Sequence, residues 1–296
     1  MNIEIRKPTM KDYYTPTECT WCDGCGDYGI WSAIRLACTE LEYQQHDVLL
    51  AFDIGCHGNM SDKIGGCYRV HGLHGRIIPF AAGAAIANPK VHVLAAGGDG
   101  ATFSEGVNHL VHAVRSNYPM VFVMHNNGNY GLTIGQASAL TPQGMVMNSS
   151  PNGIPEATIN SMDLVFSLAP TFVARGVSYD IPHMTELIKA GFKHNGFAYI
   201  DMLQACPTFN KQMTNKWLRD RVYKIDDTSG HDVHDFEKAR KLAVDTSEKI
   251  AIGVLYDAKD SRPNFYERLV PRQGKTTTLV EEVQKQDISE LMKEFV

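Results

Sequence analysis

The chain has 296 residues, of which 44% are hydrophobic and 21% charged, and this ordinary composition excludes a disordered or coiled-coil protein. Its 28 basic and 33 acidic side chains give a formal net charge of −5, without the basic stripe of a nucleic-acid-binding protein. No apolar run approaches the roughly 20 residues that span a bilayer, and residues 1–10 lack the apolar segment of a signal peptide. We therefore expect a soluble, cytoplasmic protein that binds neither nucleic acid nor membrane.

The predicted elements alternate between helices and strands. Apolar residues recur at helical spacing over residues 30–41 and 107–114, and a further helix is expected over residues 183–193. Short apolar runs, typical of strands buried on both faces, occupy residues 48–52, 91–95, 120–125, 171–175 and 197–203. This alternation predicts an α/β fold with a doubly wound, mostly parallel sheet, whose ligands bind at the carboxyl ends of the strands.

The composition changes at residue 207, after which only three of the 25 glycines remain and charged residues become dense. We predict a ligand-binding α/β domain over residues 1–206 and a C-terminal extension over residues 207–296. The extension is expected to contain a helix around residues 235–254 and to pack on the domain or on a partner subunit.

A GDG sequence at residues 98–100 ends one predicted strand, and an Asn-Asn pair at residues 126–127 ends the next. Mg²⁺ prefers carboxylate, amide and phosphate oxygens, so Asp99, Asn127 and the backbone carbonyl near Asn129 are candidate ligands. The glycines let the backbone approach a diphosphate, toward which the following helix points its N–H groups. Either segment alone would usually be a simple turn. Together, with 25 residues between them, they resemble the thiamine diphosphate motif.

Four of the seven cysteines are candidate metal ligands. Cys22 and Cys25 form a CxxC on a glycine turn, and Cys56 and Cys206 each follow a predicted strand. Because these segments end at the same edge of a parallel sheet, four thiolates can converge there. Four cysteines suit either zinc or a [4Fe–4S] cluster, and their spacing does not separate the two. The neighbouring thiamine motif favours the cluster, because an electron carrier beside thiamine could accept electrons from the reaction there.

At this point the chain resembles the β subunit of the 2-oxoacid:ferredoxin oxidoreductases, which include the pyruvate and 2-oxoglutarate enzymes. The resemblance extends over residues 15–270. The matching segments are WCDGCG (21–26), IGC (54–56), HGLHGR (71–76), PFAAGAAIANP (79–89), GDGATFSEGVNHLVHA (98–113), NNGNYGLTIGQ (126–136), TP (141–142) and CPTFN (206–210).

The resemblance implies a fold of the thiamine diphosphate-binding type and a role for each motif. One [4Fe–4S] cluster would be held near the thiazolium ring by Cys22, Cys25, Cys56 and Cys206. Mg²⁺ would be held by Asp99, Asn127 and the Asn129 carbonyl. The remaining residues placed at thiamine diphosphate are Gly55, Cys56, His74, Gly98, Gly100, Gly131, Leu132 and Thr133. The other three cysteines have no matching role, although Cys19 stays a minor alternative ligand.

The implied reaction is the coenzyme A-dependent oxidative decarboxylation of a 2-oxoacid, either 2-oxoglutarate or pyruvate, to acyl-CoA and CO₂. Electrons would pass through the cluster to ferredoxin, and the reaction can also run in reverse as a carboxylation. In thiamine enzymes a glutamate activates the cofactor. Glu105 follows GDG too closely for this task, so the resemblance implies that the partner α subunit supplies it. We therefore expect a heterodimer or a dimer of heterodimers, with no catalytic residue in this chain alone.

One departure from the family pattern affects the substrate. Ile134 stands where many relatives carry a lysine, which weakens an assignment to 2-oxoglutarate unless Arg69, Lys63 or the partner subunit meets the distal carboxylate. Pyruvate, 2-oxoglutarate and branched 2-oxoacids all stay open. Two further interpretations compete with the oxidoreductase: a non-oxidative thiamine enzyme with structural zinc, and a non-enzymatic electron-transfer or scaffold subunit.

Overall fold

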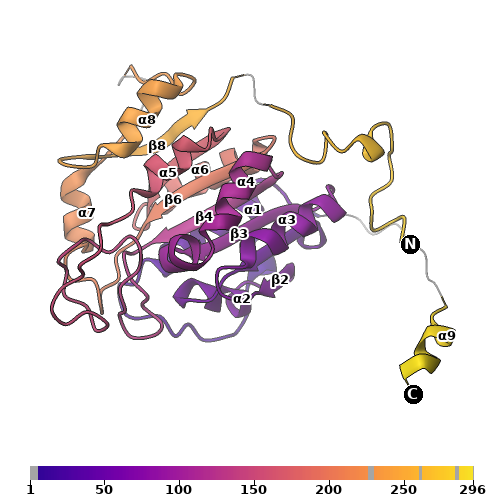
Figure 1. Cartoon of the computed structure of the whole chain (residues 1–296), viewed down its shortest axis with the longest axis horizontal. Coiled ribbons are helices and arrows are strands. Elements are labelled where there is room, and N and C mark those ends of the chain that lie inside the picture. Colours follow the sequence, from indigo (N-terminus) through magenta and orange to yellow (C-terminus); the bar gives the residue numbers. More distant parts are fainter. Residues whose placement is uncertain (1–5, 226–229, 260–261, 284–286, 296) are drawn as a thin grey trace.

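The structure is a computed structural model that describes residues 6–225, 230–259, 262–283 and 287–295. A sheet with helices on both faces forms the body of the molecule (Figure 1). The described strands are β1 (Val48–Phe52), β2 (Tyr68–His71), β3 (His92–Gly98), β4 (Met120–Asn126), β5 (Phe172–Val177), β6 (Phe197–Leu203), β7 (Val222–Lys224) and β8 (Ile250–Asp257). The described helices are α1 (Asp27–Glu40), α2 (Met60–Lys63), α3 (Ile77–Ala87), α4 (Val107–Ser116), α5 (Ser161–Ser167), α6 (Ile181–Lys193), α7 (Asn215–Arg221), α8 (Phe236–Val244) and α9 (Ser289–Met292).

The strands of the described chain form one sheet in the order β2-β1-β3-β4-β6-β5-β8-β7. All neighbours pair in parallel except β5 and β8, which are antiparallel. The carboxyl ends of β1, β3, β4 and β6 therefore lie at the same edge of the sheet. The predicted α/β class and the mostly parallel sheet are confirmed.

Apolar side chains cover both faces of the central strands. Phe122 of β4 belongs to a core that also contains residues of α3, α4, α5 and α8, whereas its neighbour Val123 belongs to a second core with residues of α1 and α6. Successive residues of a strand point to opposite faces, so a strand between two helix layers must be apolar throughout. This explains why the predicted strands appear as unbroken apolar runs.

The C-terminal segment differs from the prediction in its secondary structure. Asp235 caps α8 by accepting a hydrogen bond from the backbone N–H of Lys238, but α8 ends at Val244. The helix predicted around residues 235–254 is therefore wrong in its second half, where β8 begins at Ile250. The β8 sequence is rich in β-branched and aromatic residues, which favours a strand between β5 and β7. Strands from the predicted extension thus complete the sheet, and the boundary at residue 206 stays a prediction.

The chain after β8 packs on the body, where Phe265 N donates to the Asn117 carbonyl at 3.0 Å, before it runs toward α9, which stands apart from the sheet (Figure 1). Along this course the backbone N–H of Val280 donates to the Ala87 carbonyl at 3.3 Å, and Glu281 forms an ion pair of 2.7 Å with Lys90. The segment therefore contacts the end of α3. Among the described residues, no helix has the length and apolar character needed to cross a membrane.

Candidate active site

Four of the predicted site residues lie just after strands at one edge of the sheet, and Cys22 and Cys25 lie in the segment before α1. Cys56 follows β1, Asp99 follows β3, Asn127 follows β4 and Cys206 follows β6. The loops are joined by main-chain hydrogen bonds: Gln204 N donates to the carbonyl oxygen of Asn126 at 2.8 Å, which links the β6 loop to the β4 loop. The fold therefore brings together motifs that lie far apart in the sequence.

One cavity, which we call the GDG cavity, contains every residue predicted to contact thiamine diphosphate. Its lining residues are Ile54, Gly55, Cys56, His57, His74, Gly98, Asp99, Gly100, Ala101, Asn127, Asn129, Tyr130, Gly131, Leu132 and Thr133. Four of them, Ile54, His57, Ala101 and Tyr130, are additional to the predicted set. The arrangement puts the predicted residues around one space, while their roles in binding stay a prediction.

Asp99 is the buried acidic group of the GDG cavity, with 1% of its surface exposed. The hydroxyl of Ser138 donates a hydrogen bond to its carboxylate. Burial nevertheless raises the pKa of Asp99 to about 7, since the hydrogen bonds that the carboxylate accepts offset only part of the desolvation. A buried carboxylate whose lost hydration is only partly replaced by hydrogen bonds is suited to bind a cation.

The loop after β4 presents further oxygen atoms to the same cavity. Asn127 Oδ1 accepts a hydrogen bond from Asn129 N at 3.1 Å, and Asn210 Nδ2 donates to the Asn127 carbonyl at 2.8 Å. Asn129 Oδ1 is buried and has no hydrogen-bond partner in the described part of the chain. This amide oxygen would lie 3.6 Å from a Cβ placed at Gly131, on the side of the Cys56 and Cys206 sulfur atoms, whereas Asp99 and Asn127 line the GDG cavity with oxygen-bearing side chains of the kind that Mg²⁺ requires. The residues present therefore fit the predicted cation.

A second cavity of about 380 Å³, which we call the cysteine cavity, contains the four cysteines of the predicted cluster. Its lining residues are Thr20, Trp21, Cys22, Cys25, Asp27, Cys56, Asn59, Asn127, Gly131, Leu132, Ile134, Gln204, Cys206, Pro207, Thr208 and Phe209. Cys19, Cys38 and Cys67 are absent from this lining, and Cys38 is fully buried on α1. The two cavities share Cys56, Asn127, Gly131 and Leu132.

Neighbouring residues fix the backbone around the cysteines and leave space beside two of their sulfur atoms. The Trp21 indole donates to the Cys56 carbonyl at 2.7 Å, and Gly24, in the turn between Cys22 and Cys25, has a φ of +77° that favours glycine. A Cβ at Gly131 would lie 3.4 Å from Cys56 Sγ and 3.6 Å from Cys206 Sγ. Glycine at this position therefore leaves the space beside both sulfur atoms free.

Two thiols of the cysteine cavity, those of Cys25 and Cys56, have a raised pKa. Burial raises the pKa of Cys56 to about 12, and burial followed by the Asp27 carboxylate raises the pKa of Cys25 far above its usual range. Within the described ranges, no three His, Cys, Asp or Glu side chains are gathered to hold a single metal ion. A [4Fe–4S] cluster and a zinc ion both stay predictions for these four cysteines.

His57 is a buried wall residue of the GDG cavity to which the sequence assigned no role. Its Nε2 accepts a hydrogen bond from Gly98 N at 3.1 Å, and burial holds the pKa of His57 well below its usual range. Gly55 has a φ of +150°, and a Cβ there would lie 2.6 Å from the Cε1 of His57. Glycine is therefore favoured at position 55 for two reasons: a larger side chain would clash with the His57 ring, and the backbone φ is one that other residues rarely adopt.

Glu105 lies beside the GDG cavity and joins three of the sequence motifs. One carboxylate oxygen lies 3.1 Å from His74 Nδ1, and the other accepts a hydrogen bond of 3.1 Å from the Tyr130 hydroxyl. Its carbonyl oxygen accepts from the Arg76 guanidinium at 2.9 Å. Glu105 is not among the residues that line the cavity. These contacts make it a support for His74 and Tyr130.

Known protein families match nearly the whole length of this chain. The family model of the thiamine pyrophosphate enzyme C-terminal TPP-binding domain matches residues 53–202, and that of the C-terminal part of the pyruvate ferredoxin oxidoreductase β subunit matches residues 206–273. The 2-oxoacid:ferredoxin oxidoreductase subunit β of a Sulfolobus species is 37% identical over 303 residues, covering 92% of this chain and 98% of that protein. This chain belongs to the 2-oxoacid:ferredoxin oxidoreductase β-subunit family.

Relatives of this oxidoreductase β subunit extend to enzymes named for 2-oxoglutarate. The 2-oxoglutarate synthase subunit KorB of Methanocaldococcus jannaschii is 31% identical, covering 84% of this chain and 90% of that protein. A solved 2-oxoglutarate:ferredoxin oxidoreductase of Magnetococcus marinus, with 2-oxoglutarate, coenzyme A and succinyl-CoA bound, has a TM-score of 0.86 and 33% identity. The match covers 99% of this chain and 97% of the solved chain. The resemblance predicted from the motifs is confirmed at the family level.

The cationic residues considered for the distal carboxylate of a substrate are occupied within this β subunit. Lys63 is buried and donates to the Glu18 carbonyl at 2.7 Å, and Arg69 donates to the carbonyls of Ser61 and Ile64. Ile134 lines the cysteine cavity and is 65% exposed. No lysine or arginine is among the described residues that line either cavity of the β subunit.

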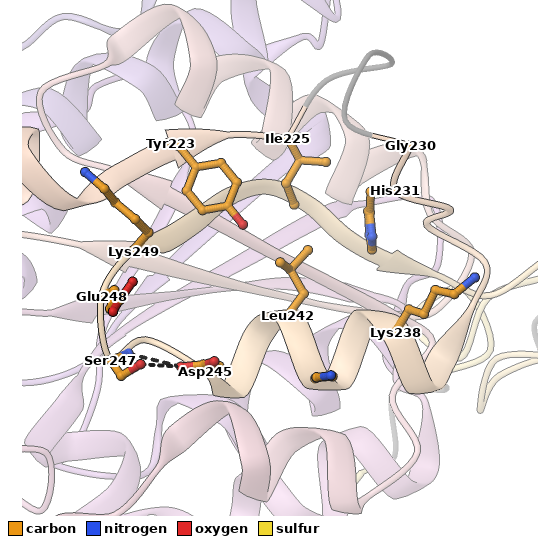
Figure 2. A pocket seen from close by; sticks show the side chains of 11 residues that line it. Tyr223, Ile225, Gly230, His231, Lys238, Leu242, Asp245, Ser247, Glu248 and Lys249 are labelled. Atoms are coloured by element: carbon orange, nitrogen blue, oxygen red, sulfur yellow. Dashed lines mark hydrogen bonds between the residues drawn. The ribbon is translucent and has the colours of Figure 1, made fainter.

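A separate cavity of about 770 Å³ is lined by residues of α8, of β7 and its following loop, and of the loop that leads to β8 in the β subunit (Figure 2). Figure 2 shows Leu242 of α8 pointing toward Tyr223 and Ile225, with charged side chains around them. Lys249 donates to the Asp220 carbonyl at 2.7 Å, and Lys238 pairs with Asp235 at 3.0 Å. The cavity contains none of the predicted site residues, and these lysines have local partners.

Proposed function

We propose that this chain is the thiamine diphosphate-, Mg²⁺- and [4Fe–4S]-binding subunit of an enzyme for coenzyme A-dependent oxidative decarboxylation of a 2-oxoacid. The products would be acyl-CoA and CO₂, with electrons passed to ferredoxin, and the same enzyme could run in reverse as a carboxylase. The observation that carries this proposal is the shared wall of the two cavities. Cys56 lines both, so a cluster bound by the four cysteines would border the space between GDG and the Asn-Asn pair.

Each cavity supplies the donor atoms that one cofactor needs. Asp99, Asn127 and Asn129 would hold Mg²⁺, and the backbone at Gly98 and Gly100 would approach the diphosphate. When bound, thiamine diphosphate supplies the electron sink that decarboxylation of a 2-oxoacid requires. A [4Fe–4S] cluster on the four cysteines would supply one-electron transfer. The chain itself excludes water behind the GDG cavity with His57, whose lowered pKa keeps it neutral.

The proposal includes a partner α subunit, in a heterodimer or a dimer of heterodimers, that supplies the activating glutamate. Exposed apolar side chains close to the cavities support a partner there: Leu73 is 77% exposed, Leu132 47% and Ile134 65%. The solved relative with coenzyme A bound supports coenzyme A as the acyl acceptor. Because neither cavity is lined by a described lysine or arginine, 2-oxoglutarate would need a cation from the partner, whereas pyruvate would not.

The decisive experiment is anaerobic purification of the chain with its α subunit, followed by iron and sulfide analysis and an assay of several 2-oxoacids. Each substrate is tested with coenzyme A and a low-potential electron acceptor. We expect about four iron atoms per chain, as one [4Fe–4S] cluster requires. Cys206→Ala should abolish the cluster and the acceptor reduction, whereas Cys38→Ala, at a buried cysteine outside the cavity, should retain both.

The competing interpretations give different results in the same preparation. A colourless protein with one zinc and acceptor-independent decarboxylation would identify a non-oxidative thiamine enzyme. Failure of the complex to bind thiamine diphosphate with Mg²⁺ would identify an electron-transfer or scaffold subunit. Either result would overturn the proposed oxidoreductase function.

A further inference from the structure

The buried side chain of His125 contacts both a carboxylate, that of Asp27, and an amide, that of Gln204. His125, in β4, is 1% exposed, and its Nδ1 lies 2.9 Å from Asp27 Oδ1 and 3.1 Å from Gln204 Oε1. Both neighbours are acceptors, so Nδ1 carries the proton and donates to both. Asp27 begins α1 and Gln204 follows β6, so the histidine joins three elements of the fold.

The same two side chains meet again at one cysteine of the predicted cluster. Asp27 Oδ2 lies 3.3 Å from Cys25 Sγ, and Gln204 Nε2 donates toward the same sulfur at 3.9 Å. Asp27 is 0% exposed and Gln204 is 1% exposed, so water does not screen either contact.

The two contacts act on a coordinated cysteine in opposite directions. A metal-bound Cys25 is a thiolate, so a carboxylate beside it adds negative charge and disfavours the uptake of an electron. An N–H donor toward the sulfur has the reverse effect, because hydrogen bonds to cluster sulfurs stabilise added negative charge. Both effects are large only where water is excluded, as it is around Asp27 and Gln204.

We propose that Asp27 and Gln204, both oriented by His125, set the reduction potential of the cluster that Cys25 helps to hold. Asp27 lowers the potential and Gln204 raises it, while His125 is the positioning residue for both. The proposal deepens the proposed function, since it requires that the four cysteines bind a [4Fe–4S] cluster. It assigns roles to three residues that lie outside the ligand set.

The test is a redox titration of the anaerobic holoenzyme followed by electron paramagnetic resonance. The measured step is the uptake of one electron from a mediator by the [4Fe–4S]²⁺ cluster, which becomes [4Fe–4S]¹⁺ without taking up a proton. Asp27→Asn should raise the midpoint potential, and Gln204→Met should lower it. Asp23→Asn is the matched control: this carboxylate lies in the same CxxC turn but is exposed, so its removal should move the midpoint less.

The outcomes separate this inference from the function on which it rests. A wild-type complex without about four iron atoms per chain would overturn the proposed function and this inference together. A loaded cluster whose midpoint is unchanged in Asp27→Asn and Gln204→Met, or moves in the same direction in both, would overturn the inference alone. If Asp27→Asn fails to bind the cluster, Gln204→Met decides: a lowered midpoint supports the inference and an unchanged one overturns it.

Discussion

Ser138 provides the sharpest test of the proposed cation site. Its hydroxyl donates to the Asp99 carboxylate, and its own position is fixed by Thr141, whose Oγ1 accepts from Ser138 N at 2.8 Å. A hydrogen bond to a charged group contributes about 1.5–3 kcal/mol, which corresponds to about 10- to 100-fold in a dissociation constant. Loss of a hydrogen-bond partner of a metal ligand independently weakens metal affinity by about 10- to 100-fold. Ser138→Ala should therefore raise the dissociation constant of thiamine diphosphate by this factor at a fixed, subsaturating Mg²⁺ concentration.

The assay uses the complex with its α subunit, stripped of Mg²⁺ and thiamine diphosphate and titrated by calorimetry. Ser149→Ala is the matched control, because Ser149 accepts a hydrogen bond from Ala137 N at 2.9 Å in the same loop region but is exposed. The control should bind as the wild type does. An unchanged constant in Ser138→Ala, or an equal loss in Ser149→Ala, would refute the assignment of Asp99 to the cation.

Three further substitutions test the framework of the site by thermal unfolding of the purified complex. Gly55→Ala should lower Tm, because a side chain at this φ costs about 1–3 kcal/mol and the new methyl group would displace His57; an unaltered Tm would contradict the close contact. Asp201→Ala should destabilise by about 3–5 kcal/mol, since it leaves Arg175 buried without its carboxylate at 3.0 Å. The Arg175→Met/Asp201→Leu double variant should recover part of that loss, and a double variant no better than the single one would count against the argument. Ile134→Asn should stabilise by about 1 kcal/mol, because a β-branched residue at a φ of +70° is strained and asparagine tolerates this conformation; a lower Tm would disprove this.

The positions of Cys56, Asp99, Asn127 and Cys206 could be anticipated from the sequence because each follows a predicted strand, while Cys22 and Cys25 precede a predicted helix. A parallel sheet puts the ends of its strands on one edge, so motifs that end strands become neighbours whatever their separation in the chain. The eleven predicted cofactor residues line one cavity for this reason.

The supporting residues could not be anticipated, because their contacts depend on strand order and loop path. His57 meets Gly98, and Glu105 meets His74 and Tyr130, only once β1, β3 and β4 are adjacent. The β8 strand was missed for a different reason. A charged, helix-forming segment precedes it, and the apolar run that follows suits either a helix or a strand until the free edge of β5 is known.

The antiparallel pairing of β8 with β5 means that one edge of β5 stays uncovered until late in the synthesis of the chain. Until residues 250–257 leave the ribosome, β5 presents a bare row of backbone donors and acceptors, which is the kind of surface that recruits other strands. A nascent or truncated chain that stops near residue 206 would carry the cysteines and the GDG motif on an unprotected sheet edge. Strand β8 therefore covers an edge that would otherwise pair with other chains. The yield of soluble protein should fall sharply when a shortened chain lacks β8.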